Sequence, residues 1–589
     1  MRERVVLGCW AGAWGDSPAA AQQLVRGAAI DYLVADHLAE ITMALLARAR
    51  AKDPAGGYIP DVVQALGPLL GELHERGIKV VTNAGGLNPA ACAAALRAAA
   101  AAAGVPLRVA HVDGDDVAGR HDELRAAGVR DMFTGEELPE QVLTMNAYLG
   151  ARPVAVALDR GADIVVTGRC VDSAVVLGPL LHEFGWGDDD HDLLSAGTLV
   201  GHILECGPQS VGGLFTDWEQ VPGWDDMGYP VAECRADGSA VITKPAGTGG
   251  LVTPATVGEQ LLYEIGDPGA YVMPDVVCDW RDVRLEQEGP DRVLVTGARG
   301  AAPTATYKVT TTALDGFRLT GTATFAGGDA AGRARRAGEA VLARGGRLAQ
   351  EAGFAPFSET SVEVVGGGDL AAPAGGHVPG REAVVKIAAK HSERDALALL
   401  GREFAPFGLV AQGMTGFVGG RPKASPVIRL LHVLVDKAAV PVTVTLDGER
   451  EAVAVAPGGG AVRSTPVLPE PEAGAAPGTG RGRTVALREI AWARSGDKGN
   501  DANIGLIARR PEFVAVLRDQ VTAARVAELF GPWLQGDVRR WELPGMGAIN
   551  IVLGDVLGGR GGTSSLRLDP QGKSYGATLL DLPVELPTP

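Results

Sequence analysis

The sequence predicts an α/β protein with a Rossmann-like parallel-sheet domain at the N-terminus, an α+β middle region and a small α+β domain at the C-terminus. In the first part of the chain, short apolar runs alternate with helical stretches, which is typical of a parallel sheet covered on both faces. From about residue 195 the pattern changes to glycine-rich segments and further strands. The segment 456–483 is rich in Pro, Gly and Ala and lacks periodicity, so we expect a linker there.

These changes divide the 589 residues into four predicted parts. They are an α/β parallel-sheet domain over 1–195, a glycine-rich α+β region over 196–455 that completes the main domain, the linker 456–483 and a C-terminal unit over 484–589. A chain of this length is expected to fold as roughly three or four domains.

The N-terminal domain is expected to contain five strands connected by helices or turns. They lie in RVVLG (4–8), DYLVADHLAEITMALLARAR (31–50), GIKVVTNAGG (77–86), LRVAHVDGDD (107–116) and GADIVVTGR (161–169). In parallel sheets of this kind, ligands bind beyond the carboxyl ends of the strands. We therefore expect the polar residues that follow these strands to lie near a ligand site.

The middle region and the C-terminal unit show mixed patterns. In the middle region Thr253 and Pro254 begin a helix, strands are expected within 291–326 with a hairpin turn at Asp315-Gly316, and helices and strands follow at 332–352, 361–366, 381–389 and 392–405. In the C-terminal unit a strand, the loop SGDKGN and a second strand precede a helix at 511–530 and strands at 538–543, 549–554 and 575–581.

Composition excludes several classes of protein. The net charge of −17 argues against a nucleic-acid partner. Six cysteines without a C-x-x-C pair favour a reduced, cytoplasmic protein. No run of about 20 apolar residues is free of charges or turn signals, so no membrane span is expected. There is no H-x-x-x-H or H-E-x-x-H motif, and we predict no metal site.

Acidic residues after the second expected strand are the first catalytic candidates. Asp36 and Glu40 are expected to open a helix and to share one of its faces, where two carboxylates can carry out general acid/base catalysis. The alternative is that they only stabilise the positive end of the helix.

Two further segments contain reactive side chains. In TGRCVDSA, Arg169 is a candidate clamp for a carboxylate or phosphate, or else forms an internal pair with Asp172. Glu205 precedes Cys206, which is a candidate nucleophile if a base lies nearby. The alternative is that Cys206 is simply buried, as most unpaired cysteines are.

Three glycine-rich loops carry cations and are candidate anion-binding sites. Lys244 with Thr248, Gly249 and Gly250 is the strongest candidate for a pyrophosphate cradle, because glycine-loop and helix-start amides both point at a negative group. Arg421 and Lys423 lie in a second loop, and the third loop, SGDKGN, contains Ser495, Asp497, Lys498 and Asn500. None has the residue order of a P-loop, and each is equally consistent with a solvated or structural turn.

Across these loops the chain resembles the acyclic terpene utilisation (AtuA) family. The similar stretches are GAWGDSPAAA, DYLVADHLAEITMALLARA, KVVTNAGGLNPAAC, DIVVTGRCVDSA, ECGPQSVGGLFTDW, KPAGTGGLVTPATVGEQLLYEIGDP, TGFVGGRPKASP and RSGDKGNDANIGLIAR. The resemblance covers about 1–455 and 484–589, and it implies a ferredoxin-fold C-terminal domain and a role in the breakdown of citronellol and geraniol beside acyl-CoA ligases and carboxylases. It transfers no catalytic residues, and Ser17 stands where the family commonly has a basic residue.

The leading hypothesis is an enzyme that acts on a branched acyl-CoA thioester by hydration, dehydration or C–C lysis. Coenzyme A then enters as part of the substrate, no tightly bound cofactor is expected, and we expect a homo-oligomer. One alternative is a thioester hydrolase or acyl transferase that uses Cys206, and another is a non-catalytic subunit of an acyl-CoA carboxylase or ligase. The leading hypothesis requires the bends at Thr248, Arg421 and Lys498 to lie together beside Asp36 and Glu40.

Overall fold

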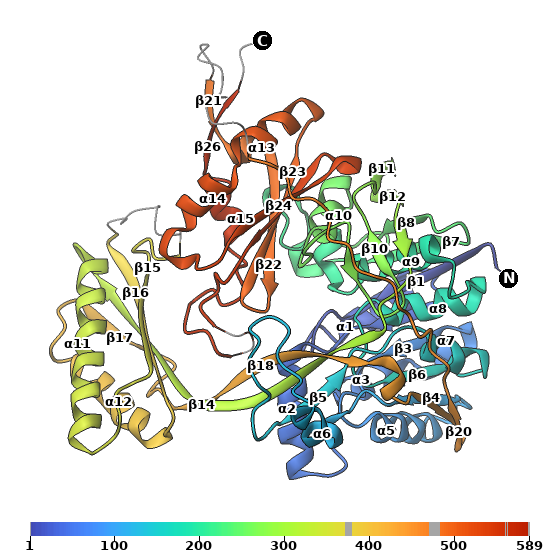
Figure 1. Cartoon of the computed structure of the whole chain (residues 1–589), viewed down its shortest axis with the longest axis horizontal. Helices are drawn as coiled ribbons and strands as arrows, with labels where there is room; N and C mark the ends of the chain where they lie inside the picture. The colour runs from blue at the N-terminus through green and yellow to red at the C-terminus, as the bar shows by residue number, and fades with distance from the viewer. Residues whose placement is uncertain (1, 371–379, 471–482, 560, 562, 587–589) are drawn as a thin grey trace.

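The protein is described by a computed structural model that covers residues 2–370, 380–470, 483–559, 561 and 563–586. Figure 1 shows a main body, a lobe on the left that a long strand connects to the body, and a C-terminal unit above and between the two.

The body is built on a mixed sheet in which eleven strands are described. Their order is β11 (Arg284–Gly289), β12 (Arg292–Thr296), β8 (Ala240–Thr243), β7 (Val231–Arg235), β1 (Arg4–Cys9), β2 (Tyr32–Ala35), β3 (Lys79–Thr82), β6 (Ile164–Thr167), β4 (Val109–Asp113), β19 (Thr443–Leu446) and β20 (Glu449–Ala452). The central strands β1, β2, β3, β6 and β4 are parallel. Antiparallel strands extend both sides, so the sheet combines strands from before and after residue 195. The Rossmann-like description of this domain stays a prediction.

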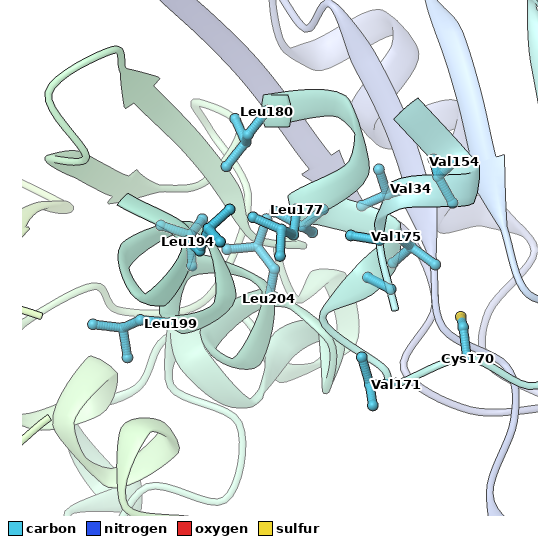
Figure 2. Packing of buried hydrophobic residues seen from close by; sticks show 14 of the residues in the cluster. Val34, Val154, Cys170, Val171, Val175, Leu177, Leu180, Leu194, Leu199 and Leu204 are labelled. Carbon is cyan, nitrogen blue, oxygen red and sulfur yellow. The ribbon is translucent and has the colours of Figure 1, made fainter. Parts of the chain in front are cut away.

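Helices cover both faces of this sheet. They are α1 (Ala19–Gly27), α2 (Glu40–Lys52), α3 (Asp61–Leu66), α4 (Leu70–Arg76), α5 (Pro89–Ala102), α6 (His121–Ala126), α7 (Arg152–Asp159), α8 (Ala174–Phe184), α9 (His191–Leu204) and α10 (Pro254–Leu261). Strand residues alternate between two hydrophobic cores, because successive side chains of a strand point to opposite faces. Leu33 and Val80 belong to one core and Val34 and Val81 to the other. Figure 2 shows the second core, where α8 and α9 pack beside Val34.

The lobe has its own core and shares strand β14 with the body. Its sheet contains β15 (Glu359–Val365), β16 (Glu382–His391), β14 (Thr306–Ala326) and β17 (Met414–Val418), with β18 (Ser425–Asp436) and β5 (Thr144–Ala147) also paired to β14. Helices α11 (Ala330–Glu351) and α12 (Arg394–Phe407) pack against it.

The prediction of a hairpin turn at Asp315-Gly316 is wrong. The chain continues through it as one strand of 21 residues. A register shift between Leu314 and Phe317 marks a bulge in the pairing with β18, and Gly316 adopts a φ of 73° there. The turn-like dipeptide therefore bends a long strand instead of reversing it.

The C-terminal unit is a four-stranded antiparallel sheet with helices on one side. The sheet order is β22 (Ala491–Lys498), β23 (Asp501–Ala508), β25 (Ala548–Leu553) and β24 (Val538–Leu543), and β21 (Arg483–Ala486) pairs with β26 (Pro583–Leu586). A small sheet of β13 (Arg299–Ala301), β10 (Val277–Asp279) and β9 (Tyr271–Val272) completes the body.

Two expectations for the C-terminal unit are corrected. The helix expected over 511–530 is divided into α13 (Val514–Gln520) and α14 (Ala523–Phe530), because Thr522 caps a new helix by accepting a hydrogen bond from the Arg525 amide. The strand expected at 575–581 is instead helix α15 (Tyr575–Leu579). Tyr575 and Leu579, four residues apart, are both buried on one face of α15, which fits a helical period.

Of the predicted linker, residues 456–470 contain neither helix nor strand, and 471–482 lie outside the described residues. In the part of the chain that the structure covers, no helix has the length and apolar character needed to cross a bilayer.

Candidate active site

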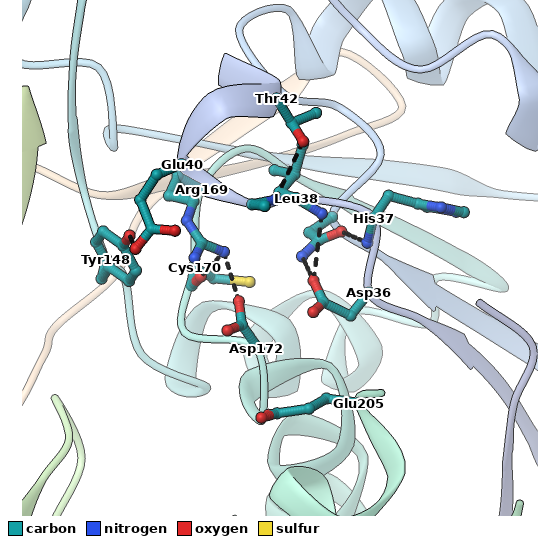
Figure 3. Close-up of polar contacts among 12 residues, drawn as sticks. Asp36, His37, Leu38, Glu40, Thr42, Tyr148, Arg169, Cys170, Asp172 and Glu205 are labelled. Carbon is teal, nitrogen blue, oxygen red and sulfur yellow. Dashed lines mark hydrogen bonds and ion pairs between the residues drawn. The ribbon is translucent and has the colours of Figure 1, made fainter. Parts of the chain in front are cut away.

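A group of polar side chains gathers where the parallel strands of the body end. Asp36 follows β2, Asn83 follows β3 and Arg169 lies two residues beyond β6. Figure 3 shows the side chains of Asp36 and Arg169 near those of Glu40, Tyr148, Asp172 and Glu205. We call the following residues the polar cluster: Asp36, Glu40, Asn83, Tyr148, Arg169, Asp172, Glu205 and Lys308.

Asp36 lies in an extended segment and not on a helix. Helix α2 begins only at Glu40, so the expectation that Asp36 and Glu40 share a helix face is wrong. The Asp36 amide donates to the Ala11 carbonyl at 2.9 Å, and the Asn83 side-chain amide donates to the Asp36 carboxyl. Burial, together with the nearby Asp172 and Glu205, raises the pKa of Asp36 well above its ordinary value. The surroundings of Asp36 therefore favour its neutral form more than those of an exposed aspartate do.

Glu40 has the opposite electrostatic environment. The Tyr148 hydroxyl donates to its carboxylate at 2.8 Å, and the Lys308 ammonium lies 3.9 Å away. Burial opposes ionisation of Glu40, but Lys308 and Arg169 outweigh it and lower the pKa below its ordinary range. Glu40 is therefore an ionised carboxylate within the same cluster.

Arg169 contacts both Asp172 and Tyr148 in the polar cluster. Its buried guanidinium donates to the Cys170 carbonyl at 2.9 Å and to Asp172 at 2.5 Å, and it stacks 4.1 Å from the centre of the Tyr148 ring. The internal pair with Asp172, left open by the sequence, is thus present. Among the described residues no hydrogen-bond partner is found for the buried Arg169 Nε atom, which leaves one donor for a bound molecule.

The backbone before Arg169 requires glycine. A Cβ atom on Gly168 would lie 2.3 Å from a carboxyl oxygen of Asp115, and the Arg169 amide donates to Asp115 at 2.9 Å. Burial raises the pKa of Asp115 to about 7. The small residue therefore lets the turn after β6 close over Asp115 and sets the position of Arg169.

Glu205 enters the cluster at the end of α9. Helix α9 approaches the start of α8 closely, because a Cβ on Gly201 would lie 2.7 Å from the Ser173 Cα. Glu205 lies 3.0 Å from His202 Nδ1. Burial and the nearby Asp172 and Glu264 raise the pKa of Glu205 well above its ordinary value.

The environment of Cys206 does not activate its thiol. Burial, Glu205 and Glu264 all raise the pKa of Cys206 well above the ordinary value. A nucleophilic cysteine requires the opposite shift, from a nearby cation or base. The raised pKa of Cys206 therefore gives no support to covalent catalysis by this thiol.

The SGDKGN segment is the turn of a β-hairpin that reaches the cluster from the C-terminal unit. Lys498 closes β22 opposite Asp501, and Gly499 adopts a φ of 69°. The Lys498 ammonium lies 5.4 Å from the centre of the Tyr271 ring. Its charge acts on the ionisation of Glu205 and Lys308, so the hairpin adds a cation to the polar cluster.

The other candidates in this hairpin hold the C-terminal unit together. The Ser495 hydroxyl donates to the Gly572 carbonyl at 2.6 Å, and the Asn500 side chain accepts from the Gly559 amide at 2.9 Å. Asp497 lies close to Glu264 and Lys573, and burial with Glu264 raises its pKa to about 7.

In the loop that was predicted to bind a pyrophosphate, the amides and the Lys244 ammonium already bond to groups of the protein. The amides of Gly249, Gly250 and Leu251 donate to the carbonyls of Asp226, Pro222 and Val211 at 2.8 Å. Lys244 donates to the Thr248 carbonyl at 2.9 Å and pairs with Asp291 at 3.2 Å. The loop therefore offers neither these amides nor a free ammonium to a phosphate, and its predicted role is not supported.

The second anion loop lies elsewhere in the molecule. Arg421 and Lys423 are exposed in the turn between β17 and β18, on the lobe (Figure 1). Of the three bends that were expected to meet beside the acidic residues, the Lys498 bend reaches the polar cluster, and the Arg421 bend does not.

Polar side chains of the C-terminal unit fix it to the body. Asn503 donates to the Leu262 carbonyl at 2.6 Å and accepts from the Glu264 amide at 2.8 Å. Asn550 donates to the carbonyls of Ile265 and Gly266 at 3.0 and 2.6 Å. These bonds hold β23 and β25 against the body, and β22, which ends in Lys498, is paired with β23.

Three contributors to the site were missed by sequence reasoning: Tyr148, Lys308 and His202. Tyr148 follows β5 and Lys308 lies on β14, and neither belongs to a motif. The scarcity of lysine, with only ten in the chain, was the one available signal for Lys308.

Comparison with known families agrees with the resemblance seen in the sequence. Residues 5–446 match the model described as acyclic terpene utilisation family protein AtuA, and residues 485–585 match the model of the AtuA ferredoxin-like domain. No curated protein and no solved structure matches the chain. The ferredoxin-like character of the C-terminal unit is thereby confirmed.

Proposed function

Because the chain belongs to the acyclic terpene utilisation family AtuA, we propose that it is an enzyme acting on a branched acyl-CoA thioester. The reaction class is hydration, dehydration or C–C lysis, in the breakdown of acyclic terpenes or branched acyl chains. In this proposal the parallel strands act as a Rossmann-like platform, and the substrate binds beyond their carboxyl ends. The protein needs no tightly bound cofactor, and coenzyme A enters as part of the substrate.

The observation that carries this proposal is the separation of carboxyl ionisation within one cluster. Lys308 and Arg169 lower the pKa of Glu40, whereas burial and neighbouring acidic groups raise the pKa of Asp36 and of Glu205. Carboxyl groups whose environments move their pKa values apart provide a base and an acid at the same pH. Proton transfer between carbon and oxygen atoms requires this pair of groups.

In the dehydration direction, Glu40 removes a proton from the carbon next to the thioester carbonyl. The C–H electron pair forms the carbon–carbon double bond, the C–O bond to the hydroxyl group breaks, and a neutral acid, Asp36 or Glu205, donates the proton that completes the departing water. Arg169 and Lys498 stabilise the negative charge that develops on the carbonyl oxygen. Hydration is the same sequence in reverse, and no redox partner is needed.

The proposal is tested with 3-methylbut-2-enoyl-CoA as a branched probe, in deuterated water. We expect the protein to form a hydrated product with deuterium at the carbon next to the carbonyl, measured by mass spectrometry, and the probe to raise the melting temperature. Absence of both deuterium incorporation and thermal stabilisation at saturating probe contradicts the proposal.

Replacing Cys206 with alanine is expected to leave turnover of the same probe within about twofold of the wild type. Burial and the nearby acidic groups raise the pKa of the thiol, which disfavours the nucleophilic thiolate. Loss of turnover in Cys206→Ala, with an unchanged circular dichroism spectrum, would instead support the thioester hydrolase or acyl transferase alternative.

A further inference from the structure

His202 lies in the last turn of α9, beneath Glu205, and both of its ring nitrogens have neighbours. The side chain is almost fully buried, at 1% exposure. Nε2 lies 3.0 Å from the Leu261 carbonyl oxygen, and Nδ1 lies 3.0 Å from a Glu205 carboxyl oxygen. The ring of Trp280 is 5.3 Å from the imidazole ring, centre to centre.

These contacts determine where the imidazole proton lies. A carbonyl oxygen only accepts hydrogen bonds, so Nε2 carries a proton and donates it to Leu261. Burial, with the charge of Lys498, lowers the pKa of His202 to about 4, and the ring is neutral at neutral pH. A neutral imidazole carries one N–H proton, so Nδ1 has a lone pair facing Glu205.

The contact at Nδ1 then requires a proton on Glu205. A carboxylate oxygen 3.0 Å from a lone pair is repelled by it, whereas a carboxyl O–H donates to it. We propose that His202 and Glu205 form a proton-sharing pair, in which a neutral imidazole of fixed tautomer holds Glu205 as a neutral carboxylic acid. His202 is the positioning residue, and the proton of Glu205 lies on its bond to Nδ1, so Glu205 must turn this O–H away from His202 before it can donate it to a substrate.

The charged groups around Glu205 are consistent with this pair. They come from several elements: Asp172 and Glu264 oppose ionisation of Glu205, Asp36 and Glu205 oppose each other's ionisation, and Lys498 and Arg169 favour ionisation of Glu205. Burial is the largest influence and acts with the acidic neighbours. When Glu205 gives up its proton, Lys498 and Arg169 are the cations that favour the new charge.

The use of this proton in catalysis rests on the proposed function, but the protonation state does not. The test is therefore an infrared difference spectrum of substrate-free protein, wild type minus Glu205→Gln, recorded over a pH range. We expect the C=O band of a protonated carboxyl group at pH 7, which Glu205→Gln removes. A wild-type spectrum with only a carboxylate band at this position at pH 7 overturns the proposal, whatever reaction the protein catalyses.

Two substitutions at His202 test the roles of its two ring nitrogens one at a time. In His202→Gln the amide nitrogen takes the place of Nε2 and keeps the Leu261 bond, but no acceptor remains at the Nδ1 position. Loss of one hydrogen bond to the neutral form is expected to lower the titration midpoint of Glu205 by roughly half to one pH unit. In His202→Asn the amide oxygen replaces Nδ1, and the midpoint is expected to stay near the wild-type value.

Glu259 provides a matched control. It is a second buried acid, its pKa is raised by burial to about 8, and it accepts from the Thr216 amide. The band removed by Glu259→Gln should be unaffected by His202→Gln. An equal shift of both bands would show a general rearrangement and overturn the specific role of His202.

Discussion

Replacing Glu40 with glutamine is expected to lower kcat/KM for the branched acyl-CoA probe by about a hundredfold to ten-thousandfold, the usual contribution of a general base. The amide keeps the size of the side chain and can still accept the Tyr148 hydrogen bond, which is 2.8 Å long in the wild type. It has no carboxyl group, so it can neither remove a proton from the carbon in dehydration nor deliver one to it in hydration of the probe. The loss is measured as initial rates and as deuterium incorporation next to the thioester carbonyl.

The ionisation of Lys308 is expected to make the activity depend on pH. Burial lowers its pKa to about 8, with Lys498 and Arg169 adding to the effect against the attraction of Glu40. As the pH rises through 8, Lys308 loses the proton whose charge keeps Glu40 ionised and positioned, and activity is expected to fall. Lys308→Arg keeps the charge and should move this decline to higher pH. Wild-type activity that stays constant to pH 10 would contradict the assigned role of the pair.

The centre of the fold was predictable because its signals are local. Runs such as Val80–Thr82 are apolar and short, and the parallel arrangement follows from their alternation with helices. Strand β5 was not predicted, since its four residues are stabilised by pairing with β14 far along the chain. The same long-range pairing keeps β14 extended through Asp315-Gly316, because β18 and β16 bind the strand on either side of the bulge.

The candidate site, like the fold, was predictable only in part. Residues directly after strands, such as Asp36 and Arg169, were found because the sheet topology brings strand ends together. Their charge states were not predictable, since these depend on partners such as Lys308 that no motif identifies. The anion-binding role expected for the Lys244 loop is not supported, for a related reason. The carbonyl groups of Pro222 and Asp226 accept hydrogen bonds from the loop amides, and nothing in the loop's own sequence indicates this contact.

The amides of Asn503 and Asn550 connect the ferredoxin-like domain to the body, and replacing both with alanine is expected to weaken its docking. The double variant leaves the carbonyls of Leu262, Ile265 and Gly266 without these donors in a buried interface. Each buried polar group left unpaired costs about 1–3 kcal/mol. The two side chains also bond each other at 2.9 Å, so their effects are not additive, and we expect a loss of roughly 2–4 kcal/mol in docking.

Hydrogen exchange separates release of the domain from its unfolding. Docking weakened by this amount should speed exchange of the amides at 262–266 by between about thirtyfold and a thousandfold, while the amides of β23 and β25, which belong to the domain's own core, stay protected. Turnover should fall as well, because Lys498 reaches the polar cluster only while β22 is held against the body. Asn500→Ala is the matched control: this asparagine lies in the same hairpin but bonds within the domain, to Gly559 and Asp555. If it speeds exchange at 262–266 as much as the double variant does, the two interface amides are not what holds Lys498 in the site.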